Sequence, residues 1–362
     1  MITFFDLVQR NDFRNFVSNR ISNASEVGYA FPRELPRLYK YRSLSSYAVD
    51  DIINGKLSFS AIGEFNDIFD GAMHLYGSKQ EIEKAAEAKW AEIERLQNAS
   101  HFPEGLLRKE SIVIPYLEYF KTQSRLKFRE LDYLGTYVFC LSEEKTSTLM
   151  WAHYADSNKG ICVEYDFNQL SIRNLLRSLL FPVAYTAEPI NLSDLLADTG
   201  NQLYPYPLDA AVLCAALNKA AMWRYEKEWR MVFVAASSSE KERRLHINSF
   251  VQPSKVFLGY HFLKPFFYYN YRNQSEIDNC EERIRKFMEL LSYLRNNSIP
   301  IAVMVPAIGS YQFIPCDIPT DELYEFMLKH FQDEQAECMR YYYTIHDCLM
   351  DLIEETQENA HV

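Results

Sequence analysis

Two glutamates, Glu226 and Glu228, are separated by one residue in the stretch MWRYEKEWRMVFV. The alternation of this stretch predicts a strand that carries both glutamates and Arg230 on one face and aromatic and apolar residues on the other. Carboxylates at positions i and i+2 of a strand repel each other, so they must be solvated, paired with cations or used in chemistry. The structural alternative is pairing with a nearby cation: Arg224, Lys227 or Arg230.

A second concentration of chemically capable side chains lies between two predicted strands, one that ends at Ser142 and one at 160–165. This connection carries more donors, acceptors and rings than a simple turn requires, which indicates the mouth of a site. In the alternative interpretation, Met150, Trp151 and Tyr154 cap the core and the other side chains are solvated. The polar and aromatic side chains in question are Ser142, Ser147, Trp151, His153, Tyr154, Asp156 and Lys159.

A sheet must position these groups. A basic and aromatic strand at 38–42 precedes a helix that is capped within Ser43–Ser46 and stopped by Asn54-Gly55. The strand KLSFS follows, and VQPSKVFLGY, Glu281–Asn296 and IPIAVMVPAI predict a strand, a helix and a strand. The expected fold class is α+β, with a central, mostly antiparallel and split sheet, flanking helices, a helical insertion and a C-terminal helical extension.

The 362 residues divide into three expected parts: an N-terminal helical segment (1–35), an α+β core (36–319) and an acidic helical extension (320–362). A capping box at Ser78 and helical spacing to residue 131 place a helical insertion at about 78–131 within the core. The net charge is −11, and the chain from Asp321 onward holds eleven acidic and two basic residues. We expect the extension to bind a protein partner or a second copy of the chain.

Composition excludes several function classes. No stretch is long and apolar enough for a membrane span, and the N-terminus does not read as an export signal. The seven cysteines form no C-x-x-C pair, which favours a reducing cytoplasm and no structural zinc. Outside the acidic tail the chain is nearly neutral, so nucleic acid is expected only as a local substrate. P-loop, G-x-G-x-x-G, H-E-x-x-H and G-x-S-x-G motifs are absent from the sequence.

The acidic and aromatic segment EFNDIFDG offers a metal-site hypothesis, because Asp67 and Asp70 are close in sequence. The same Asn, Asp and Gly residues are what a turn requires, and EF-hand spacing is absent. The turn is the favoured interpretation, and no metal is expected.

Six stretches occur in an order that resembles a widespread bacterial family of unknown function, number 2971. Order and spacing match over roughly residues 36–316. The proline usual after Asn66-Asp67 is replaced by Ile68, which leaves the shape of this turn open, whereas the usual acidic residue is kept as Asp70. The stretches are LYKYRSL, IINGKLSFS, FNDIFDG, VFCLSEEKTSTLMWAHYADSNKGICVEYDF, MWRYEKEWRMVF and VFLGY.

The order of a basic-aromatic strand, a serine-bearing strand and an E-x-E strand is also similar, more remotely, to the ADP-ribosyltransferase fold. This resemblance implies that Glu228 stabilises positive charge on the ribose of NAD while Glu226 orients or deprotonates the acceptor. It further implies that Arg42 binds the pyrophosphate and Ser142 organises the nicotinamide ribose. The expected NAD-binding residues are Tyr41, Arg42, Ser142, Trp151, His153 and Tyr154, with Trp151 or Tyr154 stacking on a ring.

Three functions remain open at this point. The first is an NAD-dependent ADP-ribosyltransferase-like enzyme, with NAD as substrate, acting as a bacterial toxin or phage-defence effector. The second is a non-catalytic module that binds a nucleotide or a protein. The third is a metal-dependent nuclease that uses Asp67, Asp70, His153 and Glu228.

Overall fold

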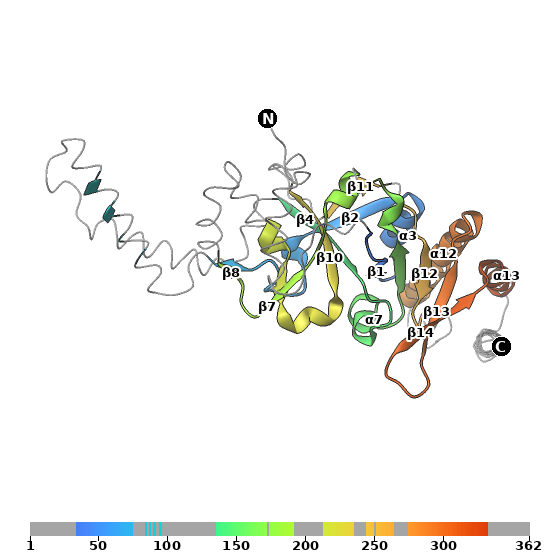
Figure 1. Ribbon diagram of the computed structural model, residues 1–362. Coiled ribbons are helices and arrows are strands. Elements are labelled where there is room, and N and C mark those ends of the chain that lie inside the picture. The colour runs from blue at the N-terminus through green and yellow to red at the C-terminus, as the bar shows by residue number, and fades with distance from the viewer. Residues whose placement is uncertain are drawn as a thin grey trace.

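The centre of the molecule is a ten-stranded sheet that is antiparallel except for one parallel pair, β12 with β13 (Figure 1). Eight strands follow the order β11-β2-β4-β1-β5-β12-β13-β14, and β10 pairs with both β4 and β6. The computed structural model describes residues 34–74, six positions between 84 and 95, and residues 135–171, 174–191, 213–234, 244–249, 251–263 and 274–331.

The sheet strands are β1 (Leu38–Arg42), β2 (Lys56–Ala61), β4 (Thr136–Ser142), β5 (Ile161–Tyr165), β6 (Leu180–Pro182), β10 (Glu228–Val234), β11 (Arg244–Asn248), β12 (Lys255–Leu258), β13 (Ile301–Pro306) and β14 (Phe313–Ile318). Two small parallel pairs join β3 (Met73–His74) to β8 (Ile190–Asn191) and β7 (Ala184–Thr186) to β9 (Asn218–Ala220). The α-helices are α3 (Ser46–Ile53), α7 (Thr148–Tyr154), α8 (Leu175–Ser178), α12 (Gln274–Asn296) and α13 (Thr320–Phe331). Short 3-10 helices are η1 (Ile62–Glu64), η2 (Phe167–Gln169) and η3 (Ala221–Glu226).

The sheet splits beside β4. One edge of β4 pairs with β10 along its whole length, whereas the other edge pairs with β1 only at Ser142 and with β2 only at Tyr137 and Val138. Where β1 diverges from β4, the Lys40 ammonium donates to the carbonyl oxygen of Cys140 at 2.8 Å. A side chain therefore satisfies a strand carbonyl that no neighbouring strand reaches on that edge.

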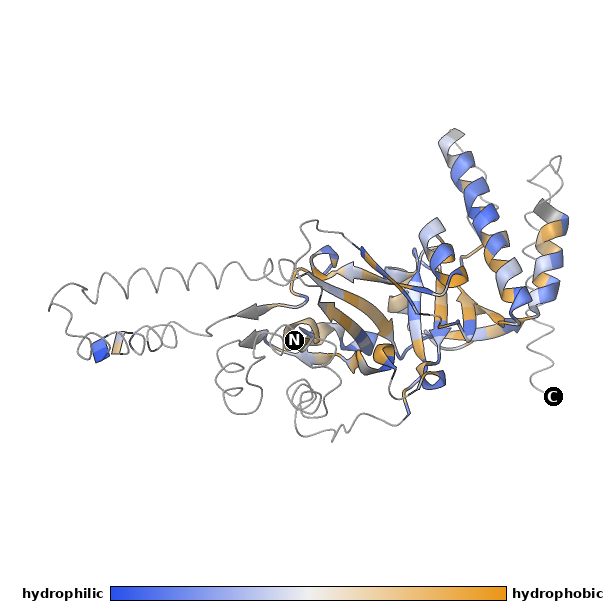
Figure 2. Ribbon diagram, turned by 90° about the horizontal axis from the view of Figure 1, so that it is seen from above, coloured by the Kyte–Doolittle hydropathy of each residue, from blue (hydrophilic) through white to orange (hydrophobic). Residues whose placement is uncertain are grey.

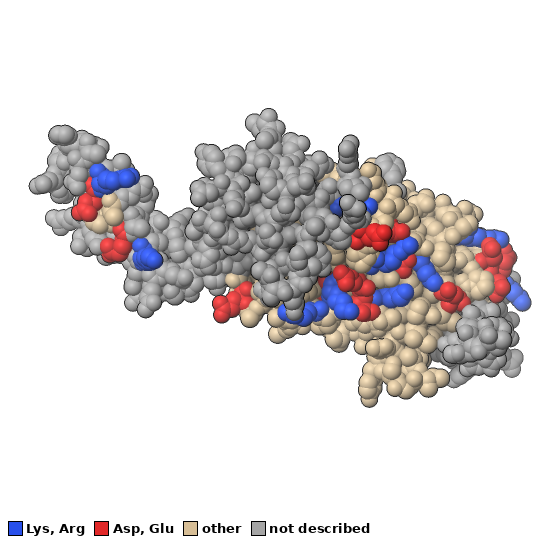
Figure 3. All heavy atoms as spheres, in the orientation of Figure 1, with Lys and Arg blue, Asp and Glu red and all other residues tan. Residues whose placement is uncertain are grey.

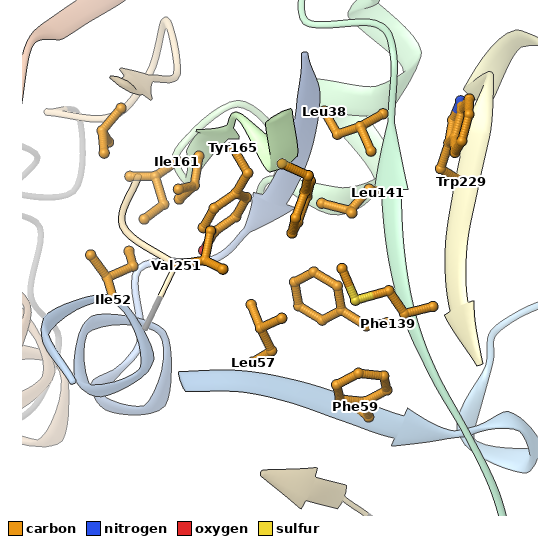
Figure 4. Packing of buried hydrophobic residues seen from close by; sticks show 14 of the residues in the cluster. Leu38, Ile52, Leu57, Phe59, Phe139, Leu141, Ile161, Tyr165, Trp229 and Val251 are labelled. Atoms are coloured by element: carbon orange, nitrogen blue, oxygen red, sulfur yellow. The ribbon is translucent and has the colours of Figure 1, made fainter. Parts of the chain in front are cut away.

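Each face of the sheet has its own apolar cluster. The larger cluster contains Leu38 of β1, Phe139 and Leu141 of β4 and residues of α3 and α12, and Figure 4 shows these β1 and β4 side chains pointing into it with Leu57 and Phe59 of β2. The smaller cluster, on the opposite face, joins Tyr39 and Tyr41 of β1 to Met150 and Trp151 of α7. We call these the α3 face and the α7 face. Figure 2 shows hydrophobic residues along the sheet strands and mainly hydrophilic ones on the surface helices.

Local sequence explains where α3 begins and ends. The Ser45 hydroxyl accepts the backbone N–H of Ala48 at 3.2 Å and so caps the first turn, as the serine-rich segment predicts. Asn54 ends the helix, and Gly55 follows with φ of +60°, a conformation that glycine adopts without a Cβ clash. This turn leads directly into β2, so the predicted strand-helix-strand unit is confirmed.

The predicted α+β class with a mostly antiparallel sheet is confirmed. The extension contains α13, which packs on α12 through ion pairs of Arg295 with Asp321 (2.7 Å) and Glu325 (3.2 Å). Among the described residues, no helix has the length and apolar content that a membrane crossing requires. The expected segment 1–35 up to residue 33, the insertion at 78–131 apart from six positions, and residues 332–362 lie outside the described residues.

One predicted element is wrong in part. The strand expected over MWRYEKEWRMVFV begins only at Glu228, because Ala221–Glu226 forms the 3-10 helix η3. Lys227 takes the left-handed conformation, with φ of +43°, and breaks the extended backbone between the two glutamates. Glu226 and Glu228 therefore do not share a strand face, and any proximity between them comes from the turn.

Candidate active site

A cavity of about 190 Å³ lies on the α7 face, beside the split between β1 and β4. Its walls come from β1, β4, β9 and β10, from α7 and η3, and from the acidic aromatic segment after η1. Cavities that take complete drug-sized ligands measure roughly 300–1,000 Å³, so this one can take only part of such a ligand. The lining residues are Tyr39, Lys40, Tyr41, Phe65, Asn66, Asp70, Cys140, Leu141, Ser142, Met150, Tyr154, Lys219, Glu226, Glu228 and Arg230.

Strand register brings three lining residues into one row. Tyr39 of β1 pairs with Ser142 of β4, and Ser142 pairs with Glu228 of β10. Residues that pair directly across neighbouring strands project to the same side of a sheet. The row therefore places a phenol, a hydroxyl and a carboxylate side by side on the α7 face.

Five buried charged side chains form the cavity cluster: Asp70, Lys219, Glu226, Glu228 and Arg230. The Lys219 ammonium lies 2.5 Å from Glu226 Oε2, 3.1 Å from Glu228 Oε2 and 3.6 Å from Asp70 Oδ2. Three carboxylates face two cations within this cluster, and Lys40, which also lines the cavity, brings the number of lining cations to three. Charged side chains rarely lie this deep unless they are paired, which explains why every one of them has a partner of opposite sign.

Arg230 is fully buried and forms the other centre of this cluster. Two of its nitrogens donate to the two oxygens of Asp70, both at 2.6 Å, and its Nε donates to Glu228 Oε1 at 2.8 Å. A further bond joins Nη1 to the carbonyl oxygen of Ala216 at 2.7 Å. The planar guanidinium satisfies this fork of acceptors, which a lysine ammonium cannot do in the same way. Asp70 is thereby fixed as an ion-pair partner of Arg230.

Glu226 is held by neighbours of three kinds. The Tyr154 hydroxyl donates to Glu226 Oε1 at 2.6 Å, and Lys219 donates to the other carboxylate oxygen. The Ser142 hydroxyl donates to the backbone carbonyl of Glu226 at 2.6 Å and accepts the backbone N–H of Glu144 at 2.9 Å. Ser142 thus joins β4 to the end of η3, and this link sets the position of Glu226 next to the strand that carries Glu228.

The two glutamates differ in protonation behaviour. For Glu228, burial opposes ionisation, but Arg230 and Lys219 outweigh it and hold the pKa at about 2. For Glu226, burial raises the pKa above its ordinary value, Lys219 opposes this, and the Glu228 charge adds to the rise. Neighbouring carboxylates whose pKa values are pushed apart can divide their tasks, one as a permanent anion and one as a proton acceptor.

Of the residues predicted for the site, five line the cavity: Glu226, Glu228, Tyr41, Ser142 and Tyr154. Trp151 does not, because it is fully buried in the α7-face cluster, where its ring meets that of Tyr41 edge-on at 5.2 Å. His153 is exposed on α7 and does not line the cavity either. An α-helix has about 3.6 residues per turn, so Trp151, His153 and Tyr154 point in different directions, toward the core, the solvent and the cavity.

Arg42 lies on the other side of the sheet. Along β1 it has the parity of Leu38, which packs on the α3 face, whereas Tyr39 and Tyr41 belong to the α7 face. Its guanidinium pairs with the buried Asp51 of α3 at 2.7 Å. The structure therefore does not bring Arg42 to the cavity with Ser142 and Glu228.

Sequence reasoning missed Lys219 and Lys40, and it treated Asp70 as part of a turn. Lys219 stands in the run LCAALNKAAM, where a single charge among apolar residues was an available indication of a buried ion pair. Lys40 is a different case, because its role follows from the split beside β4, which the sequence pattern does not reveal. Asp70 does end a turn, since its N–H donates to the carbonyl of Asp67 at 3.1 Å, and its side chain also binds Arg230.

The metal hypothesis gains no support from the described part of the chain. Within it, no group of three or more His, Cys, Asp or Glu side chains has the arrangement of a metal site. Charge on the viewed face is also mixed, since Figure 3 shows Lys and Arg side chains interspersed with Asp and Glu. This face offers no single-sign basic surface for nucleic acid.

Comparison with known proteins finds a family model that matches the middle of the chain. Residues 150–231 match the model described as "Protein of unknown function (DUF2971)". The match agrees with the family expected from the motifs, and the matched segment supplies Tyr154, Lys219, Glu226, Glu228 and Arg230 to the cavity. No curated protein and no solved structure matches the chain.

Proposed function

We propose that this protein is an NAD-cleaving enzyme of the ADP-ribosyltransferase type, which binds the nicotinamide-ribose end of NAD in the cavity. The observation that carries the proposal is the convergence of Glu226 and Glu228 with Ser142 and Tyr154 on one small cavity beside a split sheet. The cavity volume of about 190 Å³ suits one end of a dinucleotide.

The rings around the cavity favour a cationic ligand group. Four aromatic side chains contribute to the walls, whereas the formal charges of the lining residues balance, with three carboxylates and, Lys40 included, three cations. A positively charged ring is attracted by the faces of aromatic rings. The nicotinamide ring of NAD carries this charge. The aromatic wall residues are Tyr39, Tyr41, Phe65 and Tyr154.

The proposed reaction breaks the bond between C1′ of the ribose and the ring nitrogen of nicotinamide. The bonding pair moves to the nicotinamide, which leaves neutral, and positive charge develops on the ribose. The Glu228 carboxylate, ionised at neutral pH, stabilises this charge. A hydroxyl, amine or water acceptor then bonds to C1′ and releases its proton to Glu226, whose raised pKa suits a proton acceptor.

The experiment measures NAD binding by calorimetry and nicotinamide release by chromatography for the wild type and for Glu226→Gln. The expected result is a loss of turnover of about 10²- to 10⁴-fold with binding retained, because the amide keeps the size of the carboxylate but cannot accept the proton. Glu282→Gln, an exposed change on α12, is the control with unchanged turnover. Turnover by Glu226→Gln at the wild-type rate would exclude the proposed role of Glu226.

A non-catalytic nucleotide-binding module is the second candidate, and one observation favours it. Both oxygens of Glu228 are already engaged, Oε1 by Arg230 at 2.8 Å and Oε2 by Lys219 at 3.1 Å. A carboxylate in this state has a structural role that needs no reaction. The same experiment separates the two candidates, since a binding module takes up NAD without releasing nicotinamide, and a wild type that does neither contradicts both.

The proposal extends to the setting of the activity. A cytoplasmic location fits the proposed substrate, because NAD is a cytoplasmic metabolite, and the toxicity of unregulated NAD cleavage fits a toxin or defence effector. Expression of the wild type should lower cellular NAD and growth, and Glu226→Gln should not. We also propose that the C-terminal extension, residues 320–362, binds a protein partner or a second copy of the chain, which sedimentation of the full chain tests directly.

A further inference from the structure

A lysine next to the cavity holds its charge over aromatic rings. Lys145 lies in the connection between β4 and α7 (Figure 1), and its ammonium is 5.7 Å from the ring centre of Tyr39 and 5.4 Å from that of Phe257. The carbonyl oxygen of Lys145 accepts the indole N–H of Trp151 at 2.8 Å. Since Trp151 is fully buried, this bond anchors the backbone from which the lysine reaches over the sheet.

The neighbouring charged side chains on this part of the α7 face have hydrogen-bond or ion-pair partners. The register continues the row of Tyr39 to Glu164 of β5 and then to Lys255 of β12. Glu164 accepts a bond from Tyr39 and one from Ser254, and burial together with the Glu164 charge raises the pKa of Tyr39, so the phenol stays neutral. Lys255 pairs with Asp317.

Lys145 differs in its charge balance from Lys255, which pairs with Asp317. Within the described part of the chain it makes no ion pair, although its side chain is half-buried. A half-buried ammonium that lacks a carboxylate partner offers an unsatisfied positive charge to an anion. Tyr39 connects the two features, because it lines the cavity and also lies beneath the Lys145 ammonium.

We infer that Lys145 binds the phosphate groups of the dinucleotide where it leaves the cavity. This inference rests on the proposed function, in which the cavity takes only the nicotinamide-ribose end of NAD, so the pyrophosphate must lie outside it. The anionic pyrophosphate needs a cation there, and Arg42 is on the α3 face in an ion pair with Asp51. Lys145 thus takes the pyrophosphate-binding role that the resemblance to the ADP-ribosyltransferase fold implied for Arg42.

Calorimetric titration of Lys145→Gln and wild type with NAD, ADP-ribose and nicotinamide riboside tests this assignment. We expect the variant to bind NAD and ADP-ribose about tenfold or more weakly, since a charge-assisted contact to phosphate is lost, and to bind nicotinamide riboside as the wild type does. Lys145→Arg should retain most of the NAD affinity. Lys227→Gln is the matched control, because Lys227 is exposed nearby and pairs with Glu144 at 3.2 Å.

The outcomes separate this inference from the proposed function. Wild-type binding of NAD together with equal binding by Lys145→Gln overturns the role of Lys145 and leaves the proposed function standing. Equal weakening for nicotinamide riboside also overturns it, because the lysine would then shape the cavity rather than bind phosphate. A wild type that binds none of the three ligands overturns the proposed function and this inference with it.

Discussion

Two clusters of charged side chains lie on opposite faces of the sheet and differ in what adjoins them. In the first, the α3 cluster, Arg42 pairs with Asp51 at 2.7 Å, and the Ser58 hydroxyl donates to the same carboxylate at 2.6 Å. One cation thus meets one carboxylate. The cavity cluster has three carboxylates and two cations, and it lines a cavity to which Lys40 adds a third cation. A single ion pair is complete without a ligand, whereas the cavity cluster borders a space that a ligand can occupy.

The alternation of side chains along β1 explains which of its residues contact each cluster. Tyr39 and Tyr41 project to the α7 face, and Lys40 and Arg42 have the opposite parity. A basic-aromatic strand therefore supplies its aromatic residues to the cavity and its arginine to the scaffold. A basic residue next to a site in sequence can therefore lie across the sheet from it.

The largest expected effect is on the cavity cluster. Arg230→Met should lower the free energy of unfolding by about 3–5 kcal/mol, because it leaves the carboxylates of Asp70 and Glu228 buried without their guanidinium. Urea unfolding followed by tryptophan fluorescence measures the change. A loss below about 1 kcal/mol would mean that water reaches these carboxylates and the cluster is not closed.

Arg42→Met is the matched comparison in the α3 cluster. Asp51 keeps the Ser58 hydroxyl and has His246 Nδ1 at 3.8 Å, and the Arg42 side chain is itself 11% exposed. We expect a smaller loss, about 1–3 kcal/mol, and no change in NAD affinity. Equal destabilisation by the two arginine variants would contradict the difference between the clusters.

The sequence predicted most of the fold, and it did so where a local rule was sufficient. The strand before α3, the serine cap and the Asn54-Gly55 stop follow from side-chain alternation and helix-end chemistry. β4 and β5 were predicted as buried strands, but the sequence did not show that β1 lies between them. Strand order depends on contacts between distant segments, and one sequence carries no direct record of these.

Local sequence patterns also predicted part of the candidate site. Glu226, Glu228, Ser142 and Tyr154 were recognised from their types and neighbours, and all four line the cavity. The strand that was to join the two glutamates is interrupted by the left-handed Lys227, a conformation that is uncommon for a residue with a Cβ.

Arg42 and Lys219 show the limits of reading a site from sequence order. The position of Arg42 relative to the cavity depends on which face of β1 turns toward α7. Alternation divides the side chains of β1 between two faces, but it does not show which of these faces packs on α7. Lys219 reaches the cluster through β9, whose short pairing with β7 has no pattern in the sequence. Both residues are placed by long-range contacts rather than by a motif.

A change of pH should have an intermediate effect on the free energy of unfolding. The pKa of Glu228 is lowered from 4.5 to about 2 in the folded state, so its ionisation contributes stability that is present above pH 4.5 and is lost as pH falls toward 2. The contribution is on the order of 3 kcal/mol. Wild type and Glu228→Gln should therefore differ most in unfolding free energy at neutral pH and converge near pH 2. A constant difference between pH 6 and pH 2 would contradict the lowered pKa.

Tyr154→Phe should have the smallest effect on stability, and it should also shift the pH profile of the proposed reaction. The change removes the 2.6 Å hydrogen bond to Glu226 and should cost about 1 kcal/mol of unfolding free energy. That bond also lowers the pKa of Glu226 against the effect of burial, so its loss should raise the pKa further. In the proposed reaction Glu226 must be ionised to accept a proton, so the acidic limb of the pH profile for nicotinamide release should move to higher pH.

Tyr225→Phe is the control. Tyr225 is a half-buried neighbour whose hydroxyl makes no bond to Glu226 within the described residues, so its change to Phe should leave the acidic limb in place. An identical shift in both variants would show that Tyr154 acts through packing, and an unshifted limb in Tyr154→Phe would remove Glu226 as the group that titrates.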